Sequence, residues 1–293
     1  MQNVVSNTQT PKRRNYSAVR IVSFIFKHLV LILYGITCLY PFVWMLGTSL
    51  KSQQEALGNP NYVWPKQGFH FEIYAEVWEK LNFFRYFVNS MSVSLACVAG
   101  VIILYSMMGF ALARINFKGK KLVFYCYVAL ILVPGLTVQI PLYLNMVALG
   151  MSNTFIGLIL PMINGAGPFA VFLFRNFFLS MSGDLYEAAK IDGCSVFRIY
   201  SQIYLPLALP IIGTIAVMNF IGAWNGIVWP MIILRSRELY TLQMAVMYLD
   251  ESAFKQWNVL MAGSIFSVVP VILVFILFQK SYIRGLSAGA VKA

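Results

Sequence analysis

The sequence predicts an all-α, polytopic membrane protein with six transmembrane helices. Of its 293 residues, 59% are hydrophobic and only 11% are charged, a composition typical of integral membrane proteins. The charged residues are clustered and leave long charge-free runs, at 28–50, 86–113, 122–174, 199–234 and 256–279. The run 122–174 is long enough for two crossings of about 20 residues each, which brings the expected number of spans to six.

The six spans are expected at 24–50, 86–113, 122–144, 154–174, 207–234 and 258–279. The first follows a basic segment, as the apolar part of a signal peptide does. It is too long for a signal peptide, however, and no small-residue cleavage site follows it, so we expect it to remain as an anchor. Residues 1–23 then form a cytoplasmic N-terminal tail, and 24–293 form one transmembrane domain. Proline and glycine inside the spans, as at Pro134-Gly135, predict kinks or close helix packing, with rocking of the helices as the alternative.

The charge distribution predicts the orientation of the chain. With six spans and the N-terminus inside, the whole formal charge of +12 falls on the cytoplasmic segments. This is the asymmetry that the positive-inside rule requires, so both termini are expected to be cytoplasmic. A positive net charge can also indicate nucleic-acid binding. Here the basic residues flank membrane spans, so we do not expect nucleic-acid binding. Outside the membrane, the amphipathic stretch 71–81 is expected to lie on the outer interface, with contact to a soluble partner as the alternative.

The side chains that catalysis and ion coupling need are missing from the spans. No Asp, Glu, Lys or Arg lies in the interior of any expected span, and Lys27 is near the cytoplasmic end of the first; this disfavours a proton- or sodium-coupled carrier and a membrane enzyme. The chain has no Walker A sequence, so it is not expected to hydrolyse ATP itself. The four cysteines suggest packing residues rather than disulfides, and the two histidines have no ligand-like neighbours, so no metal site is expected.

The polar segment 184–206, between the fourth and fifth expected spans, has an ordered skeleton. It reads Glu187-Ala188-Ala189, three residues, Gly193, nine residues, Ile203, one residue, Leu205-Pro206. Asp184 and Glu187 favour a helix start, because acids are stabilised near the positive end of the helix dipole. Gly193 suits the position just after that helix, since glycine adopts positive φ without strain. A second short helix over 195–204, closed by Pro206, would follow.

The two predicted helices suggest a docking surface. The small Ala188–Ala189 pair, flanked by acids, would let another protein approach closely. The alternative is a surface helix that merely links two spans.

This skeleton resembles the coupling loop of the membrane subunits of ABC importers, with its whole spacing present. The resemblance is closest to the carbohydrate-type permeases, which include the smaller membrane subunit of the maltose importer. It extends to Asn89-Ser90, Ala111-Leu-Ala-Arg114, the segment 174–178, Trp224-Asn225 and the C-terminal segment 279–292. The departures are Gly183 in place of a common proline, Cys194 in place of alanine and Ala293 in place of glycine, all of them small replacements.

The resemblance implies a transport subunit, not an enzyme, in a bacterial or archaeal cell (inner) membrane. It would form half of the pathway for a sugar or oligosaccharide, beside a second permease subunit, two cytoplasmic ATPase subunits and an extracytoplasmic solute-binding protein. ATP and Mg²⁺ would bind to the partner ATPase. The expected ATPase-coupling residues are Asp184, Glu187, Ala188, Ala189, Asp192, Gly193, Ile203, Leu205 and Pro206. The alternatives are an ABC permease for another solute class and a self-contained carrier or channel.

Three residues of the fifth span are candidates for the substrate pathway: Asn219, Trp224 and Asn225. An asparagine amide can hydrogen-bond sugar hydroxyls, and an indole can stack on a sugar face. The alternative is that Asn225 makes a helix-packing hydrogen bond and that Trp224 fills a kink, because polar residues commonly join neighbouring helices.

Overall fold

The computed structural model describes residues 16–58, 62–80, 82–251 and 256–290, and these contain helices and no strand. The expectations for residues 1–15 of the N-terminal tail and for Ala293 lie outside the described residues. The long helices are α1 (Tyr16–Ser49), α4 (Phe83–Arg114), α7 (Phe155–Ser180), α11 (Leu209–Trp224) and α14 (Trp257–Ala290). The shorter helices are α2 (Gln53–Gly58), α3 (Glu72–Lys80), α5 (Lys120–Ala129), α6 (Gln139–Ala148), α8 (Asp184–Ile191), α9 (Val196–Ile199), α10 (Leu205–Leu207), α12 (Val228–Ile233) and α13 (Leu242–Glu251). Leu130–Leu132 and Arg237–Leu239 form 3₁₀ turns, and Tyr200–Tyr204 forms a π-turn.

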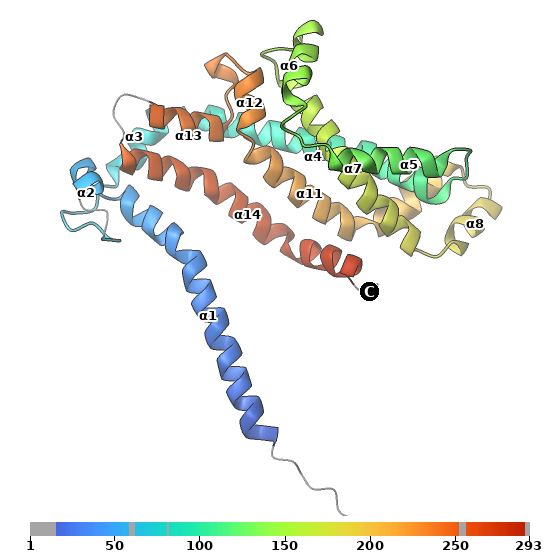
Figure 1. Ribbon diagram of the computed structural model, residues 1–293, viewed down its shortest axis with the longest axis horizontal. Helices are drawn as coiled ribbons and strands as arrows, with labels where there is room; N and C mark the ends of the chain where they lie inside the picture. Colours follow the sequence, from blue (N-terminus) through green and yellow to red (C-terminus); the bar gives the residue numbers. More distant parts are fainter. Residues whose placement is uncertain (1–15, 59–61, 81, 252–255, 291–293) are drawn as a thin grey trace, which may run out of the picture.

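Helices α4, α7, α11 and α14 lie side by side and form the body of the molecule (Figure 1). The α4–α7 contact depends on glycine. A Cβ atom added at Gly109 would lie 2.5 Å from the Cβ of Phe174, and one added at Gly167 would lie 2.4 Å from the Tyr105 ring. Small residues let two apolar helices approach until their backbones nearly touch, which is a common basis of helix association in membranes.

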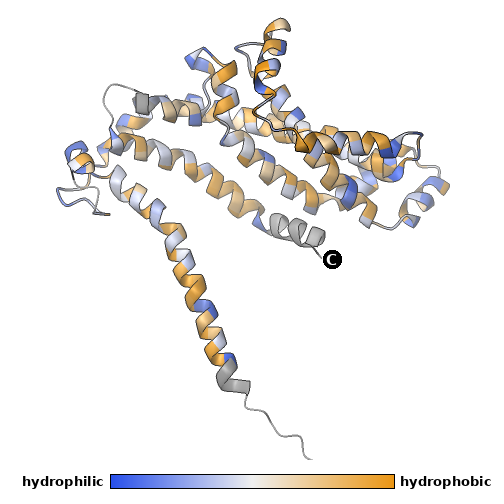
Figure 2. Ribbon diagram, in the orientation of Figure 1, coloured by the Kyte–Doolittle hydropathy of each residue, from blue (hydrophilic) through white to orange (hydrophobic). Residues whose placement is uncertain are grey.

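Helix α1 stands apart from this body and points away from it (Figure 1). Its hydrophobic window within 20–49 is not buried at all by the rest of the chain, and most of its surface is apolar (Figure 2). The end of α1 is different, because Thr48 and Ser49 are buried where the helix meets the body. An isolated apolar helix of this length would be unstable in water, so its surface requires lipid or another protein.

Four described helices are long and apolar enough to cross a membrane: Arg20–Ser49, Phe83–Arg114, Phe155–Ser180 and Trp257–Gln279. A fifth is reached if the bent pair Val196–Leu207 and Leu209–Trp224 counts as one span. The chain is therefore a multi-pass membrane protein, whereas the expected number of six helical spans is not confirmed.

The third expected span, 122–144, is not one helix. Helix α5 ends at Ala129, Val133 is extended at the end of the 3₁₀ turn, and α6 begins only at Gln139. The break falls at Pro134-Gly135, where the residue before proline avoids the helical region and glycine adds freedom. Its apolar side chains point outward, and Leu132 is 84% exposed.

The fifth expected span, 207–234, is also shorter than predicted. Helix α11 has 16 residues, ends at Trp224 and makes an angle of 76° with the preceding helical segment Val196–Leu207. The rest of the predicted span forms the separate helix α12, after a break at Asn225–Ile227.

Within the amphipathic stretch 71–81, Glu72–Lys80 form the helix α3, and its apolar face packs on the chain itself. Ile73 and Val77 are buried, and the Tyr74 ring lies edge-on to Phe266 of α14 at 5.6 Å between centroids. Leu81, the last residue of the stretch, lies outside the described residues. Only part of this face, including the half-exposed Trp78, is left for the membrane interface.

Candidate functional site

The polar segment between α7 and α11 forms two short helical arms at one end of the body (Figure 1). The first arm is α8. Gly183 is its N-cap, and the Gly183 carbonyl accepts the backbone N–H groups of Tyr186 at 2.9 Å and Glu187 at 3.2 Å. Asp184 and Glu187 lie in the first turn, where the positive end of the helix dipole stabilises carboxylates. Asp184 therefore begins the helix, as predicted, without capping it.

The turn between the arms is a complete Schellman motif. Gly193 has a φ of +78°, its N–H donates to the Lys190 carbonyl at 3.1 Å, and the Cys194 N–H donates to the Ala189 carbonyl at 3.0 Å. A Cβ at Gly193 would meet nothing within 4 Å. The requirement for glycine here is thus entirely a backbone requirement, as predicted.

The second arm runs from Val196 to Leu207 and contains a π-turn. The Ser195 hydroxyl caps it by accepting the Arg198 N–H at 3.3 Å. In the π-turn, the Leu205 N–H donates to the Tyr200 carbonyl, one residue further back than in an α-helix. Pro206 has no N–H to donate and follows directly after this wider turn. The arm therefore continues past Pro206, contrary to the prediction that Pro206 closes it, and the chain bends at Ala208.

An aromatic cluster joins both arms to the body, and its centre is Phe110 of α4. The Phe110 ring centroid lies 5.0 Å from that of Tyr204, 5.4 Å from Tyr200, 5.9 Å from Phe178 and 6.2 Å from Tyr186. Offset and edge-on aromatic pairs at these distances add stability beyond the area that they bury. The four-residue spacing of Tyr200 and Tyr204 is visible in the sequence, but its partner on α4 is not.

The arms present part of the predicted coupling set to solvent. Six members of this set are exposed: Asp184, Glu187, Ala188, Asp192, Gly193 and Pro206. Two others, Ile203 and Leu205, are half-buried. Ala189 is only 6% exposed and packs with Tyr186 against the chain's own core, three positions apart on the inner face of α8. The expected Ala188–Ala189 docking surface is therefore wrong in part, and only Ala188 faces outward.

Several large apolar side chains of the arms that were not predicted as site residues are also exposed, and two of them are the most exposed. Ile191 is 86% exposed and Phe197 is 65% exposed, on the first and second arms respectively. Exposed apolar side chains mark a surface that contacts another protein or lipid when they form a contiguous patch.

Trp224 lies in the core rather than on an open face. It is 1% exposed, its indole N–H donates to the Ser267 carbonyl of α14 at 3.0 Å, and its ring stacks on Phe220 with centroids 5.6 Å apart. Phe87 of α4 covers it edge-on at 5.8 Å. In this conformation the indole offers no ring face to a solute, and it holds the end of α11 against α14 and α4.

The two asparagines of the predicted pathway differ in environment. Asn219 is half-buried, and its amide donates to the Ile215 carbonyl of its own helix at 2.8 Å. Asn225 is exposed just after α11, and its side-chain oxygen accepts from the Gln243 amide at 3.2 Å. Of the three predicted residues, Asn225 alone is exposed at the surface of the chain.

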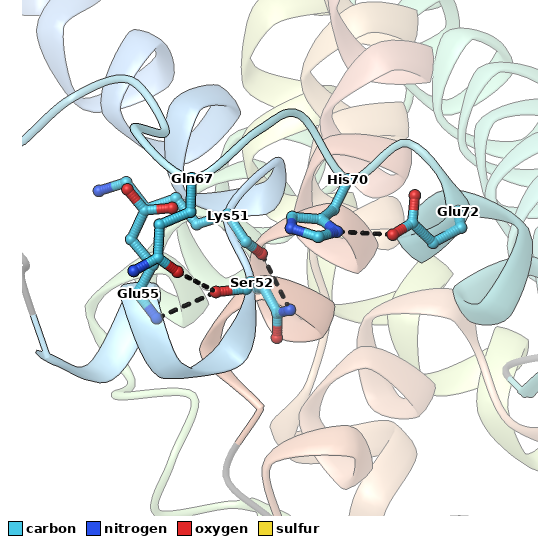
Figure 3. Close-up of polar contacts among 7 residues, drawn as sticks. Lys51, Ser52, Glu55, Gln67, His70 and Glu72 are labelled. Atoms are coloured by element: carbon cyan, nitrogen blue, oxygen red, sulfur yellow. Dashed lines mark hydrogen bonds and ion pairs between the residues drawn. The ribbon is translucent and has the colours of Figure 1, made fainter.

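The segment that follows α1 is folded onto the start of α14 (Figure 3). Lys51 is fully buried; its ammonium donates to the Tyr62 carbonyl, and its own carbonyl accepts from the Asn258 amide at 3.1 Å. The Ser52 hydroxyl donates to Gln67 at 3.4 Å. The bond to Asn258 fixes the end of α1 to α14, and the other two contacts fold the following segment onto it.

Nearby, the His70 ring contacts the Glu72 carboxylate at 2.6 Å (Figure 3). This hydrogen bond lowers the pKa of Glu72 from its ordinary value. The Glu72 side chain is 71% exposed, so solvent screens the pair and it adds little to stability. The buried Lys51 and Asn258, not this pair, hold the segment in place.

Comparison with known proteins gives consistent matches over most of the chain. Residues 105–287 match the family of the binding-protein-dependent transport system inner membrane component. The arabinooligosaccharides transport system permease protein AraQ of Bacillus subtilis is 32% identical over 287 residues, which cover 94% of this chain and 97% of that protein. The diacetylchitobiose uptake system permease protein NgcG of Streptomyces coelicolor is 34% identical over 264 residues, which cover 89% and 87% of the two chains.

Solved structures of bacterial ABC transporters contain chains with a similar fold. A chain from the crystal structure of a bacterial ABC transporter involved in the import of the acidic polysaccharide alginate has a TM-score of 0.76 and 26% identity. The match covers 92% of this chain and 99% of that chain. A chain from a bacterial alginate ABC transporter in complex with an alginate pentasaccharide-bound periplasmic protein has a TM-score of 0.60 at 15% identity, which shows the shared fold.

The matched family segment begins in the second half of α4 and includes both arms, the aromatic cluster and α11. It therefore contains the surface described above and the helices on which that surface is mounted. This chain belongs to the family of inner-membrane components of binding-protein-dependent transport systems, which are the permease subunits of ABC transporters and not themselves enzymes.

Proposed function

We propose that this chain is half of the translocation pathway of an ATP-driven importer for a sugar or oligosaccharide. The proposal is supported by relatives whose names specify arabinooligosaccharides and diacetylchitobiose. The observation that carries the coupling part is the pair of arms at 184–206, which combines an exposed acidic and apolar outer surface with an aromatic inner face packed on Phe110.

The complex that we propose contains a second permease subunit, two cytoplasmic ATPase subunits and an extracytoplasmic solute-binding protein. ATP and Mg²⁺ bind to the ATPase subunits, which dock on the outer surface of the two arms. Asp184, Glu187 and Ala188 are the central contacts, with Asp192, Gly193 and the second arm (Ile203, Leu205, Pro206) setting the shape of the loop. Ala189 supports this surface from within. The lipid- or protein-facing surfaces of α1 and of the broken segment 130–140 accommodate the bilayer and the second permease.

The proposed membrane arrangement has six crossings, with residues 1–23 and the C-terminus in the cytoplasm and 24–293 forming the permease domain. The third crossing is made by α5 and α6 together, with the break at Pro134-Gly135 satisfied by neighbouring protein. Non-helical backbone is tolerated at membrane depth when other protein or water covers its polar groups. This arrangement keeps the 184–206 arms on the same side as the basic segments.

For the substrate pathway, we propose that Asn219 of α11 and Asn225, which directly follows α11, supply polar groups to the solute. Trp224 takes a different role from stacking on a sugar, because its indole is enclosed by Phe87, Phe220 and α14. It sets the position of Asn225, which follows it in the sequence.

The test of the coupling proposal is charge reversal at Glu187. The Glu187→Lys variant is expected to leave the chain in the membrane and to lower substrate uptake at least tenfold. Truncating one partner of a buried charge pair in an interface costs about 2–5 kcal/mol, and reversal adds repulsion. Uptake of the sugar bound by the co-purified binding protein is the measurement.

Lys121→Glu is the matched control. It also changes the charge by two units at an exposed residue on the proposed cytoplasmic side, but Lys121 lies outside both arms. This control should retain uptake. Wild-type uptake by Glu187→Lys would refute the coupling role, and uptake of a non-carbohydrate solute alone would move the chain to another ABC substrate class.

A further inference from the structure

Arg114, the last residue of α4, contacts both the end of α7, which leads into the first arm, and a ring of the second arm. One guanidinium nitrogen, Nη2, donates to the carbonyls of Phe178 and Met181, each at 2.6 Å. These carbonyls lie at the end of α7, immediately before α8 begins at Asp184. The guanidinium carbon also lies 5.3 Å from the ring centroid of Tyr204 in the second arm.

The chemistry of this contact favours arginine over another cation. The carbonyls at a helix C-terminus carry the negative end of the helix dipole, and the planar guanidinium can serve several acceptors while its face lies against a ring. The Nε atom of Arg114 is buried and has no hydrogen-bond partner among the described residues. Burying part of a cation and leaving one of its donors unsatisfied costs free energy. Arg114 therefore does more than place a solvated charge at the end of α4.

Phe110 extends the contact by one helical turn. Residues four apart lie on the same face of a helix, so Phe110 and Arg114 form one surface of the last turn of α4. Phe110 contacts Tyr186 of the first arm and Tyr200 of the second. One turn further back, the Ser106 hydroxyl lies 2.6 Å from the Tyr200 hydroxyl. The end of α4 therefore touches both arms and the linker that precedes them.

We propose that Arg114 is a positioning residue that fixes both arms to α4, so that a displacement of the arms moves α4. Without it, the linker 181–183 can bend and absorb the displacement, because Ser182 and Gly183 are exposed and Met181 alone packs against the core. This inference rests on the proposed function of the arms as the coupling site. In this inference Arg114 transmits the movement of the arms to α4 and does not itself contact the ATPase.

The experiment uses the complete complex in proteoliposomes with its binding protein and compares wild type, Arg114→Gln and Lys118→Gln. Lys118 is the matched control, because it is an exposed cation four residues later and its removal changes the charge equally. Three quantities are measured: the amount of ATPase that co-purifies, ATP hydrolysis stimulated by the binding protein, and sugar uptake. Arg114→Gln is expected to keep ATPase binding and hydrolysis within about twofold and to lower uptake per ATP at least tenfold.

A spectroscopic readout separates transmission from a merely structural role. Spin labels at Asn116→Cys and Lys190→Cys, in a chain without its four native cysteines, report the distance between the end of α4 and α8. We expect a narrow distance distribution that is unchanged by ATP in the wild type and a broad one in Arg114→Gln. Tyr204→Leu, which removes the ring but keeps both hydrogen bonds, is expected to lower uptake per ATP by a smaller factor.

Unchanged uptake per ATP in Arg114→Gln would overturn the inference, and so would loss of ATPase binding in that variant, since the residue would then serve assembly alone. Failure of the proposed function looks different. In that case no ATPase co-purifies with the wild-type chain, and no variant has a hydrolysis rate to compare.

Discussion

At the residue scale, the strictest backbone requirement in the two arms is at Gly193. Its φ of +78° lies in the left-handed region, and both hydrogen bonds of the Schellman turn depend on it. The space around it is open, so a side chain there would be excluded by conformation and not by collision.

Gly193→Val is therefore expected to lower uptake strongly, because a β-branched residue in the left-handed region costs at least about 1–2 kcal/mol and would reset the angle between the arms. Gly193→Asn should retain most of the activity, since asparagine tolerates this region. The measurement is sugar uptake at equal amounts of each variant in the membrane. Equal activity of both variants would show that the turn is not needed in this conformation.

A second residue-scale prediction concerns Trp224. Trp224→Phe removes the donor to the Ser267 carbonyl while keeping an aromatic ring between Phe87 and Phe220. We expect the free energy of unfolding to fall by about 1 kcal/mol, the net value of one hydrogen bond, with unchanged sugar selectivity. Thermal unfolding in detergent and uptake competition among sugars check the two parts. A change in selectivity without a change in stability would place Trp224 in the pathway.

At the element scale, the α4–α7 pair is the packing unit on which the arms depend, because α7 leads into α8 and the end of α4 holds it. Gly109 brings the two helices together at Phe174. An added methyl group would lie 2.5 Å from the Phe174 Cβ and 3.0 Å from the Arg175 backbone nitrogen, and neither atom can rotate away.

Gly109→Ala is expected to lower the thermal midpoint of the chain in detergent, because overpacking of this kind costs about 1–3 kcal/mol. Gly165→Ala is the matched control: it lies in α7, is helical, and has nothing within 4 Å of the added Cβ. The control should be neutral or slightly stabilising. If the two variants unfold at the same temperature, the α4–α7 contact is looser than described.

The sequence predicted some elements well and others poorly, for identifiable reasons. The arms were predictable because glycine at 193 and the acids of the first turn act locally. Hydropathy over 122–144 predicted one span, with a kink or close packing at Pro134-Gly135; the average over the segment did not show that the helix breaks there completely. The inward position of Ala189 and the burial of Trp224 depend on partners in α4 and α14, which are distant in the sequence and leave no local signal.

At the scale of the whole molecule, the chain has more apolar surface than its own helices can cover. Helix α1 is unburied over its hydrophobic window, and the broken segment after α5 exposes Leu132, Leu136 and Ile140. Lipid can cover a regular helix, but non-helical backbone at membrane depth is tolerated only where protein or water covers it. The second permease subunit proposed above would supply that cover at this surface.

The six-crossing arrangement makes a specific prediction for thiol labelling. Single cysteines replacing Lys118 and Lys190 should react with an impermeant reagent only after the membrane is opened, whereas cysteines replacing Lys66 and Ser152 should react from outside. The native Cys38, Cys97, Cys126 and Cys194 are replaced first. Positions 118 and 152 flank the broken segment, so labelling of both from the same side would show that α5 and α6 do not cross the membrane.

The central claim is that this chain couples to separate ATPase subunits through the arms at 184–206. The most direct measurement is mild-detergent affinity purification of the chain from its native membrane, with mass spectrometry of the proteins that accompany it, for the wild type and Glu187→Lys. We predict an ATPase and a second permease with the wild type, and loss of the ATPase with retention of the second permease in the variant. A stable wild-type chain recovered without any ATPase, or equal ATPase recovery with an unimpaired variant, would contradict the claim.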